Sequence, residues 1–459
     1  MRLAPDRVKK RLERLDVIRR IRHHAFAGPV FLVGGALREC ALGHTPNDYD
    51  LALSRVEDLS RLEEIFGASS FLLGKKPIQT HRIVAADTVI DVTLLKGGIE
   101  EDLLRRDFTI NAMAYSIEDG LIADPFGGFE DIEARLIRCP AEGSLRADPL
   151  RMVKAVRHLS ALSGFTLDPA LTRAMESERG LVHRTAVERI RYELDLIMVA
   201  KNPYKGIKAM EETGLLFEIV PELTALGEMD RERGLEPQAL GHTIGGFRYM
   251  GRIKRFHPFT ERETRHAGYA LLLHDLGKAG TFSYDEEKGR VHFFYHERLS
   301  REMAALVMDR LRFSASDMKS ILSLIENHMR IFLISNREAT EKATRRIVYK
   351  MEHLTPALIF LTLLDLYGSS HGRDNESTAL VLDRCRELLR AYDEWKSEPL
   401  ARIVTGHDLL ALGFGQGPAL GQVLEEIREK QIAGEIMEKG EALHYAAGRL
   451  AAEETSSGG

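Results

Sequence analysis

Short apolar runs separated by polar turns mark the first third of the chain. The runs at residues 30–33, 71–73, 82–84 and 88–94 have the length of strands, whereas residues 36–42 and 57–66 have helical spacing. From about residue 138 onward, helical patterns replace the strand-like runs. The pattern predicts an α+β chain, in which a small mixed sheet with helices is followed by an all-helical remainder.

The N-terminal 27 residues predict an amphipathic helix. Val8, Leu12, Leu15, Ile18 and Ile21 fall on one side of it. The segment is basic but lacks the apolar centre of a signal peptide, and no apolar run in the chain approaches the length of a membrane span. We therefore expect a cytoplasmic protein with no membrane partner.

Residues 31–54 combine a glycine turn with two closely spaced acids. Gly34 and Gly35 allow close approach of the backbone to a bound group, and they lead into a helix start that carries Arg38. Such a turn presents free N–H groups, which suit phosphate. Asp48 and Asp50 point to one face of the next strand, where two carboxylates can hold Mg²⁺ beside a triphosphate. Either feature alone is typical of a turn or a solvated loop; together they predict a nucleotide–metal site.

A third acid, Asp91, lies inside the apolar strand at residues 88–94. A carboxylate in such a strand is costly unless it has a partner. A cation shared with Asp48 and Asp50 would be that partner, and a nearby arginine is the alternative.

The string RRDFTINAMAY begins with two adjacent arginines, Arg105 and Arg106. Two neighbouring guanidiniums cannot both be buried without anions, and their planar forks fit a triphosphate. Asp107 can accept a hydrogen bond from a ribose hydroxyl, and Asn111 can brace that region. The alternative for this charged triplet is a cluster on the surface.

A helix predicted after Pro149 carries charged residues at helical spacing. These are Asp148, Arg151, Lys154 and Arg157, which place an acid and three cations along one groove. A solvated helix stripe is the alternative.

From about residue 236 the chain carries a spread of histidines and acids on predicted helices. Its members are His242, His274, Asp275, His296, His328 and Asp365. The His274–Asp275 pair is set into an apolar run and needs a partner, which a metal ion would provide for both side chains. Imidazole and carboxylate together suit Mn²⁺, Ni²⁺, Fe or Mg²⁺.

Composition adds little to these motifs. The net charge of −5 gives no global basic signal, so any RNA binding must use local patches. The three cysteines, Cys40, Cys139 and Cys385, are widely spaced and form no metal motif; they are typical of reduced thiols.

The head motifs resemble those of the tRNA nucleotidyltransferase and bacterial poly(A) polymerase family, part of the polymerase β superfamily. The departures are Glu39 for Asp, Ala147 for Glu, Lys154 for Arg, and His158 for an aromatic residue. The order H…HD…H…H…D resembles the HD phosphohydrolase superfamily. The resemblance implies five parts: an N-terminal helix (1–27), a polymerase β-type nucleotidyltransferase head (28–137), a helical neck with the base-reading helix (138–235), an HD domain (236–370) and a helical C-terminal tail (371–459).

The resemblance also implies residue roles. Asp48 and Asp50 would hold Mg²⁺, Asp91 would assist the attacking hydroxyl, Asp107 would read ribose, and Asp148 with Arg151 would read the base edge. The triphosphate would contact Gly34, Gly35, Arg38, Arg105 and Arg106. The HD metal ligands would be His242, His274, Asp275 and Asp365, with His296 and His328 contacting phosphate or a second metal.

The implied reaction is template-independent transfer of CMP, AMP or both from CTP and ATP to the 3′ end of tRNA, whose acceptor arm is also a partner; DNA is not. Only residues 92–104 separate Asp91 from Arg105, which is shorter than the flexible loop of enzymes that complete CCA, and this indicates the CC-adding subtype. The alternatives are a full CCA-adding or A-adding enzyme, then a poly(A) polymerase, an HD-domain metal-dependent phosphohydrolase, and a non-catalytic RNA-binding protein. The sequence carries no signal for an oligomeric state.

Overall fold

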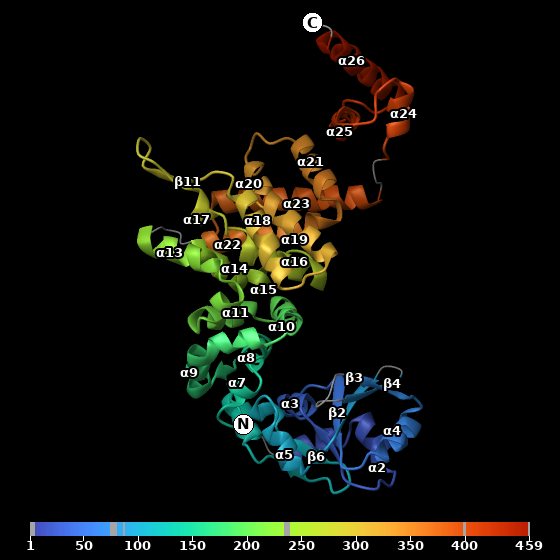
Figure 1. Cartoon of the computed structure of the whole chain (residues 1–459), viewed down its shortest axis with the longest axis vertical. Coiled ribbons are helices and arrows are strands. Elements are labelled where there is room, and N and C mark those ends of the chain that lie inside the picture. Colours follow the sequence, from blue (N-terminus) through green and yellow to red (C-terminus); the bar gives the residue numbers. More distant parts are fainter. Residues whose placement is uncertain (1–4, 74–79, 86–87, 234–238, 398–400, 458–459) are drawn as a thin grey trace. The chain divides into compact units, whose positions relative to one another are not determined.

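The computed structural model describes residues 5–73, 80–85, 88–233, 239–397 and 401–457, and it divides into two compact units (Figure 1). Unit 1 contains Met1–Lys201 and Lys205–Ile219, and unit 2 contains Asn202–Tyr204 and Val220–Gly459. The predicted boundary between the neck and the HD domain, at residues 235 and 236, lies outside the described residues.

A seven-stranded sheet forms the head in unit 1 (Figure 1). In spatial order its strands are β3 (Ser70–Leu73), β4 (Thr80–Ala85), β5 (Thr88–Leu94), β2 (Asp48–Leu53), β1 (Val30–Val33), β6 (Ala114–Ser116) and β7 (Ile122–Ala123). Strands β2 and β5 run parallel, and the other neighbours are antiparallel. The predicted mixed sheet is therefore confirmed, and its parallel pair carries the three predicted acids.

Burial of small and branched apolar side chains holds the head together. Leu32, Leu51 and Leu53 are fully buried on the central strands. A core cluster joins the sheet to the segment around α5 (Ile99–Leu104) through Val33, Ala52, Leu103, Ala112 and Ala114. The other head helices are α3 (Gly35–Leu42), α4 (Asp58–Phe66) and α6 (Gly128–Ala134). These contacts fix the strand ends where the polar side chains gather.

The N-terminal segment forms two helices where one was expected. These are α1 (Pro5–Leu12) and α2 (Asp16–Arg22). Leu15, between them, is extended at φ −65° and ψ 135°, which interrupts the helical hydrogen bonding. All five apolar residues of the predicted stripe are nevertheless buried, so the pattern located the buried face although it did not locate the break.

The neck of unit 1 is helical except for one short strand. Its helices are α7 (Ser144–Ala147), α8 (Arg151–Ala161), α9 (Pro169–Glu178), α10 (Val187–Val199), α11 (Pro203–Glu212) and α12 (Leu215–Ile219). Strand β9 (Thr166–Leu167) pairs in parallel with β8 (Leu136–Ile137), which corrects the expectation of an all-helical neck. Helix α8 packs against α10 and is thereby held beside the head.

Unit 2 is built around α22 (Thr355–Ser369), whose residues Thr355–Gly368 are all buried. It contacts α14 (Ala239–Gly246), α16 (Glu261–Leu273), α19 (Ala315–Asn327) and α23 (Glu376–Ser397). A helix that is apolar on all sides belongs in a core, so its one charged residue, Asp365, needs a partner there. Other elements of this part include α13 (Leu223–Arg233), α15 (Met250–Ile253), α17 (Lys278–Thr281), β10 (Phe282–Asp285), β11 (Arg290–Phe293), α18 (His296–Arg310), α20 (Arg330–Leu333) and α21 (Glu341–Met351). The antiparallel pair of β10 and β11 corrects the expectation that this part is all helical.

The last three helices of unit 2 have a hydrophobic cluster of their own. They are α24 (Gly406–Ala411), α25 (Pro418–Ile432) and α26 (Lys439–Ser457). The buried members of this cluster include Leu409, Phe414 and Val423. One stretch of unit 2, Glu341–Ser369, is long and apolar enough to cross a membrane, but 72% of its most apolar window is buried inside the folded chain. That burial identifies it as a core element.

Candidate functional site

The three predicted strand acids lie together on the parallel strand pair. Asp48 and Asp50 alternate on β2, and Asp50 is the direct neighbour of Asp91 in the register of β2 and β5. Burial raises the pKa of Asp50 above its usual range; Arg106 opposes the rise, whereas Asp91 and Asp48 add to it. Three carboxylates this close repel one another, and a divalent cation would relieve that repulsion. The donor set is all oxygen, as Mg²⁺ prefers.

Asp91 also has the arginine partner that the sequence left open. Arg82 stands directly opposite it in the register of β4 and β5. The guanidinium donates from Nε to Oδ1 and from Nη2 to Oδ2, both at 2.7 Å. The strand acid is therefore neutralised by a bidentate pair.

The glycine turn lies between β1 and α3, directly against the acids. Gly34 has φ +77°, in the range that side chains disfavour. A Cβ atom at Gly34 would lie 2.7 Å from Asp50 Oδ2 and 2.9 Å from Arg106 Nη1. Glycine is needed here because both charged groups occupy the space that a side chain would fill.

Charged partners hold the predicted phosphate-binding arginines. Arg106 contacts Asp102 at 3.1 Å, and Arg105 contacts Glu101 at 2.7 Å. Arg38 pairs with Glu39 at 2.9 Å and donates to the side-chain oxygen of Asn111. These pairs pre-orient the arginines, and the carboxylate of Glu39 fills the position at which the resembling family has Asp.

Asp107 is fixed by three donors. It accepts from the Phe108 backbone N–H and the Asn111 amide, both at 2.9 Å, and from Lys154 at 3.5 Å. Burial by itself would raise the pKa of Asp107, but Lys154 and these hydrogen bonds hold it well below its usual range. Asp107 is therefore an ionised acceptor. The Asn111 amide holds the carboxylate in place.

A cavity of about 620 Å³ opens between the glycine turn, the RRD segment and the start of α8. Its volume lies within the usual range for small-molecule sites. It is lined by Gly34, Gly35, Asp50, Leu104, Arg105, Arg106, Asp107, Asn111, Ala141, Glu142, Gly143, Ser144, Ala147, Asp148, Arg151 and Lys154. Most of the predicted nucleotide-binding residues thus face one space.

Two of the predicted residues turn elsewhere. Arg157 is absent from the cavity lining and pairs with the buried Glu193 of α10 at 2.6 Å. Arg157 lies on α8, but its side chain turns to the Glu193 carboxylate on α10, in the neck. Arg38 lies behind the lining, where it orients Asn111.

Sequence reasoning missed three contributors to this region. Asp102 holds Arg106, Arg82 holds Asp91, and the loop Ala141–Gly143, with Ser144 at the start of α7, closes one wall of the cavity. Asp102 stands four residues before Arg106, a spacing that predicts a helical ion pair. The loop gave no signal in its sequence.

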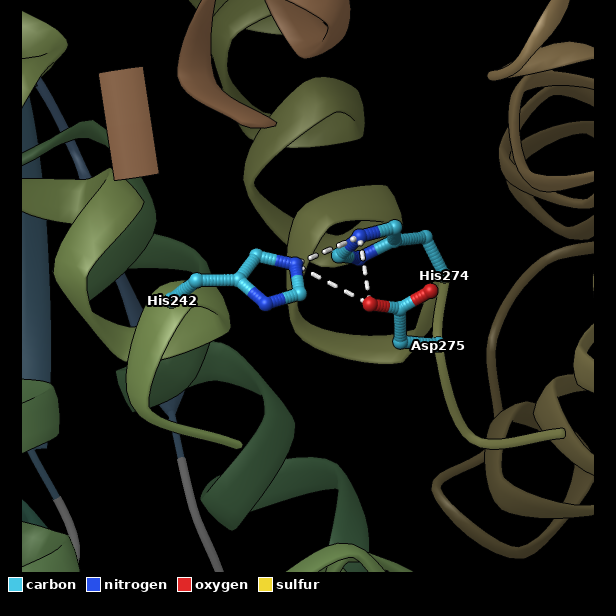
Figure 2. A group of neighbouring side chains, drawn as sticks. All are labelled: His242, His274 and Asp275. Atoms are coloured by element: carbon cyan, nitrogen blue, oxygen red, sulfur yellow. Dashed lines mark hydrogen bonds and ion pairs between the residues drawn. The ribbon is translucent and has the colours of Figure 1, made fainter. Parts of the chain in front are cut away.

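The second constellation also assembles. His242 on α14 points at His274 and Asp275, which directly follow α16 (Figure 2). His242 Nε2 lies 3.0 Å from Asp275 Oδ2 and 3.3 Å from His274 Nε2. Three overlapping groups of the predicted residues bring their ligand atoms within 4.8 Å of one another, and together they include His296, His328 and Asp365.

Three imidazole rings of the cluster bind backbone oxygens through Nδ1 and direct Nε2 toward the centre of the cluster. The Nδ1 atoms of His274, His296 and His328 lie 2.7 to 2.9 Å from the backbone oxygens of Leu271, Phe293 and Ile325. A carbonyl oxygen only accepts, so each Nδ1 carries a proton; burial lowers the pKa of His296 and of His328, and these two neutral rings present a lone pair at Nε2. His296 Nε2 and His328 Nε2 are 3.2 Å apart. Two lone pairs at this distance need a cation between or beside them.

The carboxylates of this cluster demand positive charge as well. Both oxygens of Asp275 are buried without a hydrogen bond among the described residues, although Lys278 Nζ lies 2.6 Å from Oδ2. Burial would lower the pKa of His274, but Asp275 and Asp365 raise it to about 10. Burial lowers the pKa of His328 to about 3, assisted by the charge of His274. The residues fit a bound divalent metal, which would satisfy the acids and the neutral rings together.

The sequence matches three known domain families in chain order. Residues 78–138 match the poly A polymerase head domain, residues 164–226 match the probable RNA and SrmB-binding site of polymerase A, and residues 239–368 match the HD domain. These matches fall on the head, the neck and the histidine cluster.

Relatives match most of the chain as well. The chain is 31% identical to an A-adding tRNA nucleotidyltransferase of Deinococcus radiodurans, with 88% of this chain and 92% of the relative covered. It is 30% identical to a CC-adding tRNA nucleotidyltransferase of Thermus thermophilus, with 92% and 94% covered. Among solved structures, the CCA-adding enzyme of Bacillus stearothermophilus in complex with CTP aligns over 96% of this chain and 97% of that one, at 22% identity and a TM-score of 0.66. This last likeness concerns the fold.

Proposed function

This chain belongs to the tRNA nucleotidyltransferase family, and we propose that it is the CC-adding member, which transfers two cytidylates from CTP to the 3′ end of tRNA. The enzyme class follows from the relatives, whose alignments cover 88% and 92% of this chain. The cytidylate assignment is finer, because relatives named as A-adding, CC-adding and multifunctional CCA proteins all match.

One observation supports the CC-adding assignment. Strand β5 ends at Leu94 and α5 begins at Ile99, so only residues 95–98 join them. A flexible loop between the third acid and the RRD segment would serve the switch from CTP to ATP, and four residues leave no room for it. We therefore propose that this enzyme stops after the second cytidine.

The proposed reaction is an in-line displacement at the α-phosphate of CTP by the terminal 3′ hydroxyl of tRNA, with pyrophosphate leaving. Divalent cations held by Asp48 and Asp50 would neutralise the developing phosphate charge. Asp91 would assist the attacking hydroxyl. Gly35 backbone N–H and Arg106 would orient the triphosphate, and Asp107 would accept from the ribose.

In place of a template, side chains at the start of α8 and just before it would select the base of the incoming nucleotide. Asp148 and Arg151 both line the cavity, and Arg151 is buried and braced by the Arg105 carbonyl at 2.5 Å. Arg189 of α10 lies 3.4 Å from Asp148. An acid and an arginine together present acceptors and donors that can match the edge of cytosine. The parts 1–27, 28–137, 138–235, 236–370 and 371–459 remain our proposed domain division, with the whole enzyme cytoplasmic.

Incorporation on three tRNA substrates tests the assignment. Labelled CTP and ATP are offered separately to tRNA lacking CCA, tRNA ending in C, and tRNA ending in CC. A CC-adding enzyme adds two, one and no cytidines respectively, and no adenosine to any of them. Adenosine on tRNA ending in CC would contradict the subtype: alone it indicates an A-adding enzyme, and after cytidine a full CCA enzyme. Long adenosine tracts on unrelated RNA would indicate a poly(A) polymerase.

A second candidate activity is metal-dependent phosphohydrolysis at the HD cluster, favoured by the buried carboxylates of Asp275 and Asp365 beside three inward-facing imidazoles. Phosphate release from p-nitrophenyl phosphate with Mn²⁺ or Ni²⁺ tests it. The activity should persist in Asp50→Asn and vanish in His274→Gln. Loss of phosphate release in Asp50→Asn would place the reaction in the head.

A further inference from the structure

The Arg82–Asp91 pair differs from the ordinary surface pairs of the head. Arg61 and Glu64, for example, are three residues apart on one helix and join through a single 2.6 Å contact. Arg82 and Asp91 lie on neighbouring strands, and the guanidinium engages both carboxylate oxygens. The fork therefore occupies lone pairs that Asp91 would otherwise offer to a cation.

The pair also lies within the acid cluster. Asp91 is the register neighbour of Asp50, and both Asp91 and Asp48 contribute to raising the pKa of Arg82. Arg82 is thus the counter-ion of an acid that the proposed reaction requires next to Asp50. The pair is partly open to solvent, with 39% of the Arg82 side chain and 26% of the Asp91 side chain exposed, so the guanidinium can swing away.

We propose that Arg82 is a positioning residue that competes with divalent cations for Asp91 until a phosphate-bearing substrate arrives. This inference rests on the proposed role of Asp91 in nucleotidyl transfer. The planar guanidinium binds phosphate oxygens as readily as a carboxylate. A substrate phosphate that draws Arg82 away frees Asp91, so phosphate and metal reinforce each other at the site. Thermodynamic linkage then requires nucleotide to tighten metal binding and metal to tighten nucleotide binding by the same factor.

Mn²⁺ binding to the full-length protein, followed by electron paramagnetic resonance, tests the competition without turnover. Mn²⁺ sites that are lost in Asp50→Asn are assigned to the head. This assignment separates them from Mn²⁺ bound at the HD cluster. Because a partly exposed pair is worth little, Arg82→Gln should tighten these head sites about two- to fivefold. Arg82→Lys keeps the charge without the fork and should fall between Arg82→Gln and the parent. Arg61→Gln removes an arginine from a surface pair of the same unit and should change nothing.

A second titration includes a non-hydrolysable CTP analogue. The analogue should tighten Mn²⁺ binding more in the parent than in Arg82→Gln, where no guanidinium has to move. Unchanged Mn²⁺ affinity in a folded Arg82→Gln, or weaker affinity, would overturn the competition, as would an undiminished effect of the analogue. Asp91→Asn separates this from the proposed function: if it keeps normal incorporation and Mn²⁺ binding, the role of Asp91 itself fails.

Discussion

At the scale of single residues, close approach of charged groups determines what each position tolerates. Asp50, Arg106 and the backbone of Gly34 occupy adjoining space, and Gly34 has the positive φ that only glycine adopts without strain. The turn therefore places backbone N–H groups beside the acids, which is the arrangement that a triphosphate with its metal requires.

Gly34→Ala should strongly slow cytidylate incorporation, whereas Gly67→Ala should not. Gly67 also has positive φ, at +64°, but a Cβ there meets nothing within 4 Å. Gly67→Ala should cost about 1 kcal/mol of unfolding free energy and leave kcat unchanged. In Gly34→Ala the added methyl displaces Asp50 or Arg106, and kcat should fall about 100-fold or more. Steady-state kinetics with both variants checks this, and equal activity would show that the close approach at Gly34 has no catalytic consequence.

At the scale of elements, α8 joins recognition to folding. Its residues Arg151 and Lys154, with Asp148 just before the helix, line the cavity, while His158 is buried against Phe108 at a ring separation of 5.5 Å. Burial lowers the pKa of His158 well below its ordinary value; Arg157, Arg38 and Lys154 lower it further, and Asp107 opposes them. The histidine therefore stays neutral in the folded head.

This buried histidine predicts a pH dependence of stability. A folded-state pKa below the unfolded value means that the unfolded chain binds the proton first, so stability is lost as pH falls below about 6.5. Between about pH 6.5 and pH 5, the parent should lose about 1.4 kcal/mol per pH unit more than His158→Gln. Denaturant unfolding followed by circular dichroism measures the slopes, with His24→Gln, an exposed site in the same unit, as the control. Parallel slopes for the parent and His158→Gln would contradict the assignment.

The sequence predicted helices and strands better than it predicted which side chains contact one another. The strands at residues 30–33 and 88–94, and Asp91 on the second of them, can be predicted from apolar runs, because burial of those runs is a local property of the chain. The Asp91–Arg82 pair, the turn of Arg157 toward Glu193 and the strand β9 depend on segments brought together by folding. Alternation alone could have placed Arg82 and Asp91 on strands, but not in register. The break at Leu15 was likewise invisible, since the apolar spacing continues through it.

At the scale of the whole molecule, the two charged constellations lie in different compact units. The acids and the cavity belong to unit 1, and the histidine cluster belongs to unit 2. Each cluster finds its partners within its own unit, so metal binding in the HD domain and nucleotidyl transfer in the head should be separable.

His242→Gln should therefore remove bound metal without removing transferase activity. The variant replaces a ligand that approaches both His274 and Asp275, so the metal content of the purified protein should fall. Cytidylate incorporation should stay within about twofold of the parent, because the change leaves the head contacts intact. Elemental analysis and incorporation assays measure the two effects, with the exposed His353→Gln as the control. Loss of incorporation in a folded His242→Gln would show that the HD site supports the head.

The most direct test of the account is single-turnover incorporation of labelled CMP into tRNA lacking CCA, comparing the parent with Asp50→Asn and Asp383→Asn. Asp50 is the one of the three strand acids that lines the cavity, whereas Asp383 forms an exposed surface pair with Arg386. We predict two cytidines per tRNA for the parent and for Asp383→Asn, and a rate lower by about 10³-fold or more for Asp50→Asn with its fold retained. Undiminished incorporation by Asp50→Asn would contradict the placement of nucleotidyl transfer at the strand acids.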